Sequence, residues 1–404
     1  MTAPLDLHSP DFLRKPDEGL AMLRSQGQLV RMKLPIIGEV WVTTDFDTAR
    51  ELLVDAENFV RNPANAGGLS LEQNYWWFPR FIHPLFRNVT LMDGEDLQRL
   101  RRLVIGAFSS RGIDAMKPAI ERIADELLDA LPQDREIDLV DRFNRRFPML
   151  VICELLGIPE EDRPKIQRWM EPLGRVSNPF TVFRALPGLY HSNRYFRRDF
   201  ETVRRTGRPG LIKELVEARD GNDKLNDDEL LAMVTAIFIG GFDTTTHLIG
   251  NCFMTLLTDP TLAASLQEDL KRVNLFIEEV LRFHSPVMFT NMFHATGPVK
   301  LGGRMLERGD RVVPLLIGAN RDPAKFDGAT TFQADRKPNK HLDFGIGVHM
   351  CIGTQLARAE ATVAVNRLFT KYPDVHLTQP ADRVPMLKRI GLRGVAEMPV
   401  RVTR

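Results

Sequence analysis

The stretch FGIGVHMCIG, residues 344–353, places one cysteine among glycines directly before a helical pattern. Glycine permits positive φ angles and close backbone approach, which a merely buried cysteine does not need. The helical run at 353–372 puts Cys351 near a helix N-terminus, where the macrodipole and unpaired N–H groups favour a thiolate. The loop therefore predicts a functional thiolate.

Three uses of such a thiolate can be weighed from the residues. A zinc site needs about four ligands, and no further cysteine or histidine pair stands at zinc spacing from Cys351. A nucleophilic cysteine with His349 as its base is a second use. An axial ligand of haem iron needs one thiolate, N–H donors near the sulfur and a loop that can lie flat under a macrocycle. The loop meets these last requirements best, and the other uses stay open.

A second candidate site is GGFDTTTH, residues 240–247, in the middle of a helical pattern that runs from Asp227 to Thr258. Two glycines cost a helix interior about 1 kcal/mol each relative to alanine, so this helix is weakened at its centre. A conflict of this kind, between a strong helical pattern and residues that weaken a helix, tends to mark a functional site. Because successive helix residues point about a quarter-turn apart, Asp243 and Thr244 cannot face the same group. Back-bonding to the helix is the alternative role for both.

Most elements that must position these residues read as helices. Apolar residues at spacings of three and four predict helices within 98–108, 116–131, 148–157, 272–283 and 353–372. Strand-like runs come early, at 27–34 and 39–44, and late, at 299–303, 311–319 and 398–402. Strands at the two ends must pair with each other or stay unpaired. The pattern therefore predicts one mainly α domain with small β-sheets over residues 1–404, and an irregular arm over residues 1–20.

Composition narrows the class of protein. Net charge is +1 over 404 residues, so no global field favours nucleic acid. Three widely spaced cysteines argue against a disulfide framework and fit a reducing compartment. No basic start followed by an apolar run marks a signal peptide, and polar residues interrupt the longest apolar stretch. We expect a cytoplasmic protein with no nucleic-acid partner and no stable membrane anchor.

FGIGVHMCIG resembles the haem-binding signature of the cytochrome P450 family. Further stretches match in the expected order: EEVLR, with Glu279 and Arg282 on one helix face, resembles the Glu-x-x-Arg structural pair, and GGFDTT resembles the kinked distal helix. ANRDP, NKHLDFG, MDGEDLQRLRRLV and VICELLGIPEEDR also resemble family segments. The likeness extends from about residue 20 onward.

The resemblance implies a P450 fold in which a long central distal helix and a proximal Cys-loop helix sandwich haem b. Cys351 would be the axial ligand of the iron, Thr244 would face the iron, and Asp243 would relay protons from the surface. It implies a monooxygenase that uses dioxygen and two electrons to hydroxylate or oxidatively dealkylate a substrate. A peroxide-driven peroxygenase and a non-catalytic haem ligand-binding protein are the alternatives.

The resemblance also assigns haem contacts and reveals departures. Propionate partners would be Arg101 and His341, and other cofactor contacts would come from Phe344, Gly345, Gly353, Gly240 and Gly241. Three positions depart from the family pattern: Leu97 replaces a frequent histidine, Thr331 stands where the third member of the Glu–Arg network is usual, and an expected arginine is missing around Met292, Phe293 and His294. His294 is a candidate replacement.

Aromatic-rich segments at 74–86 and 178–190 correspond to variable loops over the family's substrate pocket. They predict an apolar substrate, with ordinary core packing as the equal alternative. Candidate lining residues are Trp76, Trp77, Phe78, Phe180, Phe238, Val287 and Phe289. Arg80 or Arg87 would be the anchor for a substrate carboxylate.

Basic residues of the proximal side would dock an acidic ferredoxin, as in the family, although such a run can also be a solvated face. They are Arg99, Arg102, Arg111, Lys117 and Arg358. Electrons would come from separate proteins, a ferredoxin and an NAD(P)H-fed ferredoxin reductase.

Overall fold

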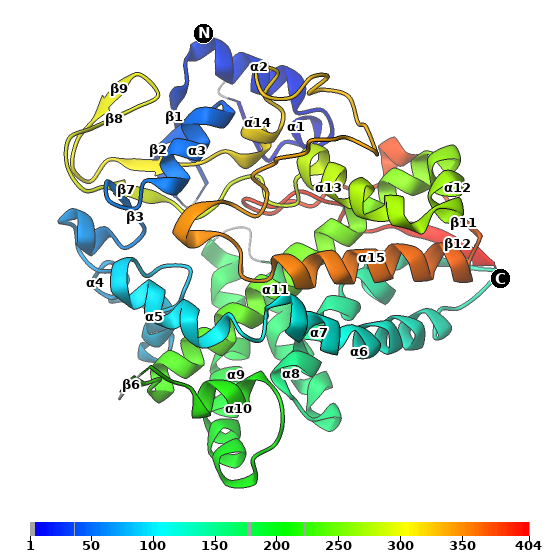
Figure 1. Cartoon of the computed structure of the whole chain (residues 1–404), viewed down its shortest axis with the longest axis horizontal. Coiled ribbons are helices and arrows are strands. Elements are labelled where there is room, and N and C mark those ends of the chain that lie inside the picture. The colour runs from blue at the N-terminus through cyan, green and yellow to red at the C-terminus, as the bar shows by residue number, and fades with distance from the viewer. Residues whose placement is uncertain (1–4, 36, 176–178, 221–222, 404) are drawn as a thin grey trace.

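The structure is a computed structural model that describes residues 5–35, 37–175, 179–220 and 223–403. Helices make up most of it; the strands within residues 29–60 and 293–313 lie toward the N-terminal end, and those at 374–377 and 399–403 lie near the C-terminus (Figure 1). The main helices are α1 (Pro10–Arg14), α2 (Asp17–Gln26), α3 (Phe46–Val54), α5 (Gly94–Val104), α6 (Ser110–Asp129), α7 (Arg146–Leu156), α8 (Arg163–Met170), α9 (Pro179–Thr206), α10 (Leu211–Glu217), α11 (Asp227–Thr258), α12 (Pro260–Glu268), α13 (Val273–His284), α14 (Leu316–Asn320) and α15 (Thr354–Lys371).

The predicted helices are confirmed with small shifts at their ends. The pattern at 98–108 is helical only as far as Val104, where α5 ends. The central helix α11 has the predicted bounds, because Asn226 and Glu229 form a capping box at its start. Its C-cap, Asp259, in turn caps α12 by accepting a hydrogen bond from the Leu262 N–H.

Helix α11 is the axis of the larger core. It packs against α7, α13 and α15, and α15 lies in front of it in Figure 1. By length and composition α11 could cross a membrane, but 67% of its most apolar window is buried inside the protein. A core helix of a globular protein explains that pattern, since a helix that is apolar all round must be covered on all sides.

The largest sheet joins the two ends of the chain, as predicted. Its strand order is β1 (Leu29–Leu34), β2 (Gly38–Thr43), β10 (Arg311–Val313), β7 (Phe293–Ala295) and β3 (Phe59–Val60). Strand β2 pairs antiparallel with β1 and parallel with β10. A second sheet has the order β11 (Asp374–Leu377), β12 (Pro399–Thr403) and β4 (Glu136–Asp138), and β8 (Val299–Leu301) pairs with β9 (Arg304–Leu306).

Three local predictions are wrong. The irregular arm is helical from Pro10 onward, because Ser9 caps α1 by accepting a hydrogen bond from the Phe12 N–H. The strand-like run at 311–319 is extended only to Val313, and α14 follows. The Pro-broken segment at 178–190 lies in the long helix α9, which contains Pro187; residue 178 itself lies outside the described residues.

Candidate functional site

Cys351 lies on the loop between a 3-10 turn (Gly347–His349) and α15. Its side chain is exposed, and its backbone N–H donates to the Phe344 carbonyl oxygen at 2.8 Å. Partial enclosure by surrounding protein raises the pKa of the thiol, whereas hydrogen bonds from the Gly353 N–H and the Thr354 side chain lower it. The loop therefore presents an accessible sulfur with a backbone donor aimed at it, a donor set that fits an axial thiolate.

Glycine is required in this loop for two separate reasons. Gly345 and Gly347 both have positive φ, +66° and +77°. A Cβ at Gly347 would also lie 2.5 Å from the carbonyl oxygen of Leu53. Gly353 has an ordinary φ of −80°, so what it contributes is its N–H group at the sulfur.

The centre of α11 carries a short exposed stripe. Gly240 is exposed and Thr244 is partly buried, whereas most residues on both sides of this stripe are buried. The Thr244 hydroxyl donates to the Gly240 carbonyl oxygen at 2.8 Å, and the segment stays α-helical. The two glycines that weaken the centre of this helix therefore do not interrupt it, and the alternative role of back-bonding is observed for Thr244.

The two glycines of this segment differ in their surroundings. A Cβ at Gly241 would lie 2.4 Å from Cδ1 of Ile152 in α7, whereas a Cβ at Gly240 would meet nothing within 4 Å. Gly241 therefore allows two helices to pack closely, and Gly240 keeps the exposed stripe uncovered.

Asp243 is buried, at 6% exposure, and forms an ion pair with Arg389. His247, one turn further along α11, has its Nε2 3.8 Å from the carboxylate. Burial raises the pKa of Asp243 to about 6, although Arg389 and Arg145 pull it down. Burial, with the same two arginines, lowers the pKa of His247 to about 3, so this imidazole is neutral at pH 7. Asp243 therefore lies in a buried, charged environment, whereas Thr244 lies on the exposed stripe of the helix.

The predicted Glu279–Arg282 pair lies in α13 with both side chains at 0% exposure. Arg282 donates to the Glu279 carboxylate from Nε at 2.8 Å and from Nη2 at 2.7 Å. The third member of the network is Arg336, whose Nε donates to Glu279 at 3.1 and 3.2 Å. Thr331 contributes its carbonyl oxygen, which accepts from Arg282 and Arg336. The interpretation of Thr331 as a departure is therefore wrong, because Arg336 supplies the charge.

The two predicted propionate partners, Arg101 and His341, differ in the contacts that they already make. Arg101 donates to the carbonyl oxygen of Met350 at 2.9 Å, beside Cys351. His341 has partners on both ring nitrogens, Glu278 at 3.2 Å and the Asp343 N–H at 3.2 Å, so no ring nitrogen remains for a propionate.

Two other positions around the expected propionates also have different roles. Leu97 is 1% exposed in the main core. His294 follows Phe293 in β7 and therefore points to the opposite face of the sheet. Because Phe293 is the neighbour that packs against His349, the structure does not support His294 as the replacement.

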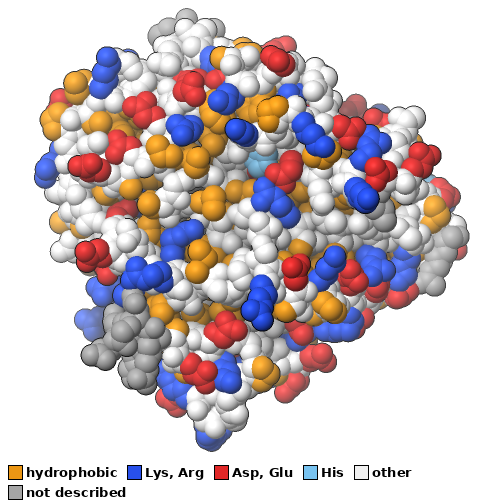
Figure 2. Space-filling model, in the orientation of Figure 1, with side chains coloured by type: hydrophobic (Ala, Val, Ile, Leu, Met, Phe, Trp, Pro, Cys, Tyr) orange, Lys and Arg blue, Asp and Glu red, His pale blue; other side chains and the backbone are white. Residues whose placement is uncertain are grey.

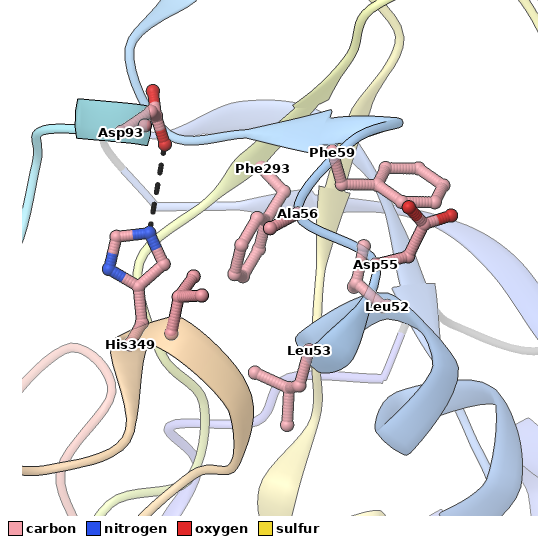
Figure 3. Close-up of a pocket in the computed structure, with 10 residues that line it drawn as sticks. Leu52, Leu53, Asp55, Ala56, Phe59, Asp93, Phe293 and His349 are labelled. Atoms are coloured by element: carbon pink, nitrogen blue, oxygen red, sulfur yellow. Dashed lines mark ion pairs between the residues drawn. The ribbon is translucent and has the colours of Figure 1, made fainter. Parts of the chain in front are cut away.

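Sequence reasoning missed an acid–imidazole contact beside the cysteine loop. His349 Nε2 lies 3.6 Å from Asp93 Oδ1, and its ring packs edge-on against Phe293 with centroids 6.1 Å apart. Figure 3 shows these three residues around a small cavity that Leu52 and Leu53 of α3 also line. The sequence shows that His349 stands two residues before Cys351. Asp93 is distant in the chain, so its contact with His349 could be seen only in the folded structure.

Comparison with known proteins now decides the family. The family model described as Cytochrome P450 matches residues 27–393. This chain belongs to the cytochrome P450 family. It is 34% identical to the vitamin D(3) 25-hydroxylase of Pseudonocardia autotrophica over 396 residues, 98% of this chain and 96% of the relative. It is 32% identical to the 6-deoxyerythronolide B hydroxylase of Saccharopolyspora erythraea over the full length of both chains.

Solved structures agree with the family. The Bacillus subtilis cytochrome P450 PksS has a TM-score of 0.89 at 28% identity, covering 99% of this chain and 100% of that chain. The predicted P450 fold, mainly α with small sheets, is confirmed. The chain is a cytochrome P450 monooxygenase, and this family uses haem-thiolate chemistry and dioxygen.

The predicted substrate residues of this P450 fall into two groups. Trp76, Trp77 and Phe180 are 75%, 52% and 70% exposed, and Trp77 stacks on Phe78 with centroids 4.2 Å apart. Phe238 is 0% exposed and packs in the main core against Phe242, and Phe289 belongs to the core under α1 and α2. Val287 is partly buried beside the core of the large sheet. Phe238 and Phe289 thus pack within core clusters, and a pocket-lining role for them stays a prediction.

The proximal face is less basic than the sequence predicted. Arg99 pairs with Glu229 of α11, and Arg358 binds Glu278 at 2.6 and 2.8 Å while its guanidinium lies over the Phe344 ring. Arg102, Arg111 and Lys117 are exposed. Figure 2, in the orientation that places α15 in front, shows basic and acidic side chains interspersed. Three of the five predicted cations therefore remain as exposed candidates for docking.

The described residues give little support to the two alternative uses of Cys351, a zinc site and a nucleophilic cysteine. Over the described ranges, no group of three or more His, Cys, Asp or Glu side chains is placed to hold a metal ion. Cys153 and Cys252 are buried, and burial raises the pKa of both thiols, that of Cys153 to about 12. His349 has Asp93 and Phe293 as its neighbours, an arrangement different from a Cys–His nucleophile pair.

Proposed function

We propose that Cys351 is the axial ligand of haem b and that the protein inserts one oxygen atom of dioxygen into an apolar small molecule. The observation that carries this proposal is the exposed Cys351 sulfur with the Gly353 N–H directed at it. Bound haem would supply the iron that activates dioxygen, and Arg101, beside the cysteine loop, would hold a propionate.

Two residues of α11 would handle protons. The Thr244 hydroxyl is fixed by its bond to the Gly240 carbonyl oxygen, on the exposed stripe of the helix. Asp243 is buried next to it in sequence, and a pKa of about 6 allows it to take up and release a proton near neutral pH. We infer that Thr244 holds a proton at its Oγ1 and that Asp243 replenishes it.

An apolar substrate is supported by the exposed aromatic side chains Trp76, Trp77 and Phe180. Structural neighbours also hold apolar ligands. The myxobacterial P450 CYP267B1 is in complex with myristic acid, at TM-score 0.89 and 32% identity. CYP109E1 from Bacillus megaterium is in complex with testosterone, at TM-score 0.83. Hydroxylation is the reaction that the named relatives favour, and oxidative dealkylation follows from the same chemistry.

Electrons would come from a separate ferredoxin and its NAD(P)H-fed reductase. Exposed Arg102, Arg111 and Lys117 on the proximal side are suited to an acidic partner. The chain would work in the cytoplasm, where such partners and NAD(P)H are available.

The test is turnover with labelled dioxygen. The holoenzyme, a surrogate ferredoxin and reductase, and an apolar compound chosen by its spin-state shift are incubated with NADPH. One labelled oxygen atom in the product is the expected result. Turnover that requires only peroxide would favour a peroxygenase. Ligand-induced spectral shifts without product from any compound that causes them would favour a non-catalytic haem protein.

A further inference from the structure

Arg61 is a buried arginine whose hydrogen bonds are incomplete. It directly follows β3 and is 8% exposed. Its Nη1 donates to the carbonyl oxygen of Thr90 at 2.8 Å, but its Nε is buried without a hydrogen-bond partner among the described residues. A guanidinium loses its hydration on burial, so an unused donor indicates that an acceptor from outside the chain belongs there.

The strand register places Arg61 opposite Phe293. Strands β3 and β7 are antiparallel, with Phe59 opposite Ala295 and Val60 opposite His294, so the next step pairs Arg61 with Phe293. The Arg61 guanidinium lies over the Phe293 ring, 4.9 Å from its centroid. The missing family arginine was expected around this part of β7. The chain therefore has an arginine directly after the neighbouring strand β3, across from Phe293.

The surroundings of Arg61 suit an anion. Asp93 accepts from the backbone N–H of Arg61 at 2.8 Å and lies 3.6 Å from His349, so this carboxylate connects Arg61 to the cysteine loop. Burial lowers the pKa of Arg61, Asp93 raises it, and the charge of Arg101, which donates to the loop at Met350, lowers it further. Asp93 is thus the one carboxylate among the described residues whose charge acts on Arg61, while Arg101 repels it, which leaves a positive charge to be balanced.

We propose that Arg61 binds a haem propionate, in place of the arginine that the family carries on the strand of Phe293. A planar guanidinium matches the geometry of a carboxylate, and a propionate would complete the hydrogen bonds of Nε. This inference rests on the proposed haem site, and it assigns the partner that Leu97, His294 and His341 do not supply.

The experiment measures transfer of haem from the holoenzyme to excess apomyoglobin. Arg61→Gln is expected to lose haem about tenfold faster than wild type, the effect of one charge-assisted hydrogen bond. Arg61→Lys, which keeps the charge, is expected to fall between them. The matched control is Arg304→Gln. Arg304 also lies over an aromatic ring, that of Trp41 at 4.4 Å, but it is an exposed residue of β9. The Arg304→Gln variant should lose haem at the wild-type rate.

A second experiment tests whether Arg61 acts by binding a carboxylate or only by stabilising the structure through its hydrogen bond to Thr90. The same variants are reconstituted with haem whose propionates are esterified, and Arg61→Gln should then match wild type. Equal acceleration for natural and esterified haem, or no acceleration for natural haem, would overturn the proposal.

An exchange variant tests the position. Arg61→Phe combined with Phe293→Arg should restore slow loss of natural haem, and a rate as fast as that of Arg61→Gln would contradict the exchange. If wild type binds no haem at all, the proposed function fails first, and that result is distinct from all of these.

Discussion

The hydroxyl of Thr244 donates to the carbonyl oxygen of Gly240, 2.8 Å away and one turn earlier in α11. Gly240 is exposed in the middle of a mostly buried helix, so this bond fixes the Thr244 hydroxyl at an uncovered part of the helix. The neighbouring Asp243 is instead buried with Arg389. This separation assigns the two side chains different tasks.

Thr244→Val keeps the shape of the side chain and removes the proton donor. We expect substrate binding to stay within about twofold, while product per NADPH falls by at least about tenfold, the low end of what a positioned proton donor contributes, and hydrogen peroxide rises. Thr244→Ser, which keeps the hydroxyl, is the matched control. Unchanged coupling in Thr244→Val would exclude the assigned role.

Asp243 predicts a pH dependence of stability. Its pKa is 3.8 in the unfolded chain and about 6 in the fold, so between these values the folded protein holds a proton that the unfolded chain has lost. Stability therefore falls as pH rises through this window, by about 3 kcal/mol in total. The Tm of wild type relative to Asp243→Asn should decrease from pH 4 to pH 6.5 and then level off. Parallel Tm curves would show that the carboxyl does not titrate in this way.

Arg336 is predicted to stabilise the α13 network. Arg336→Met leaves the fully buried Glu279 with one cation fewer, and we expect a loss of about 3 kcal/mol in unfolding free energy. The control is Arg122→Gln, which removes the ion pairs of this exposed arginine with Glu126 and Glu154 and should change stability by less than about 1 kcal/mol. Denaturant unfolding of the holoenzymes measures both. Equal effects of the two substitutions would mean that Arg336 is not part of the network's support.

The two positive-φ glycines of the cysteine loop predict a graded effect. Gly345→Ala adds backbone strain of about 1 kcal/mol because the residue has a positive φ. It adds no steric clash, because its Cβ would meet nothing nearer than 3.9 Å. Gly347→Ala adds similar strain and a 2.5 Å contact with the Leu53 carbonyl oxygen. The Tm and the haem content should therefore fall further in Gly347→Ala. The reverse order would contradict the assigned packing of the loop on α3.

The sequence predicted features that depend on local patterns. The bounds of α11 follow from its caps, and the Glu279–Arg282 pair follows from a three-residue spacing within one helix. The second cation of the network, Arg336, could not be identified because its contact with Glu279 bridges 57 residues. Helix α9 was taken for a loop because it contains Pro187, which removes one helical N–H but does not end the helix here.

The site itself was predicted best where one loop carries it. Cys351 and its glycines are contiguous, whereas Arg389 meets Asp243 across 146 residues. Arg61 meets Phe293 only because β3 and β7 pair. Apolar type alone does not distinguish core from pocket, and the burial of Phe238 among other core side chains also required the fold.

The central claim, that Cys351 is the thiolate ligand of haem iron, is tested most directly by the spectrum of the reduced carbon monoxide adduct. The wild-type holoenzyme should show a strongly red-shifted Soret band, and Cys351→His should lose that shift while still binding haem. A wild-type protein that stays colourless after expression with ample haem, or a red-shifted band that persists in Cys351→His, would contradict the account.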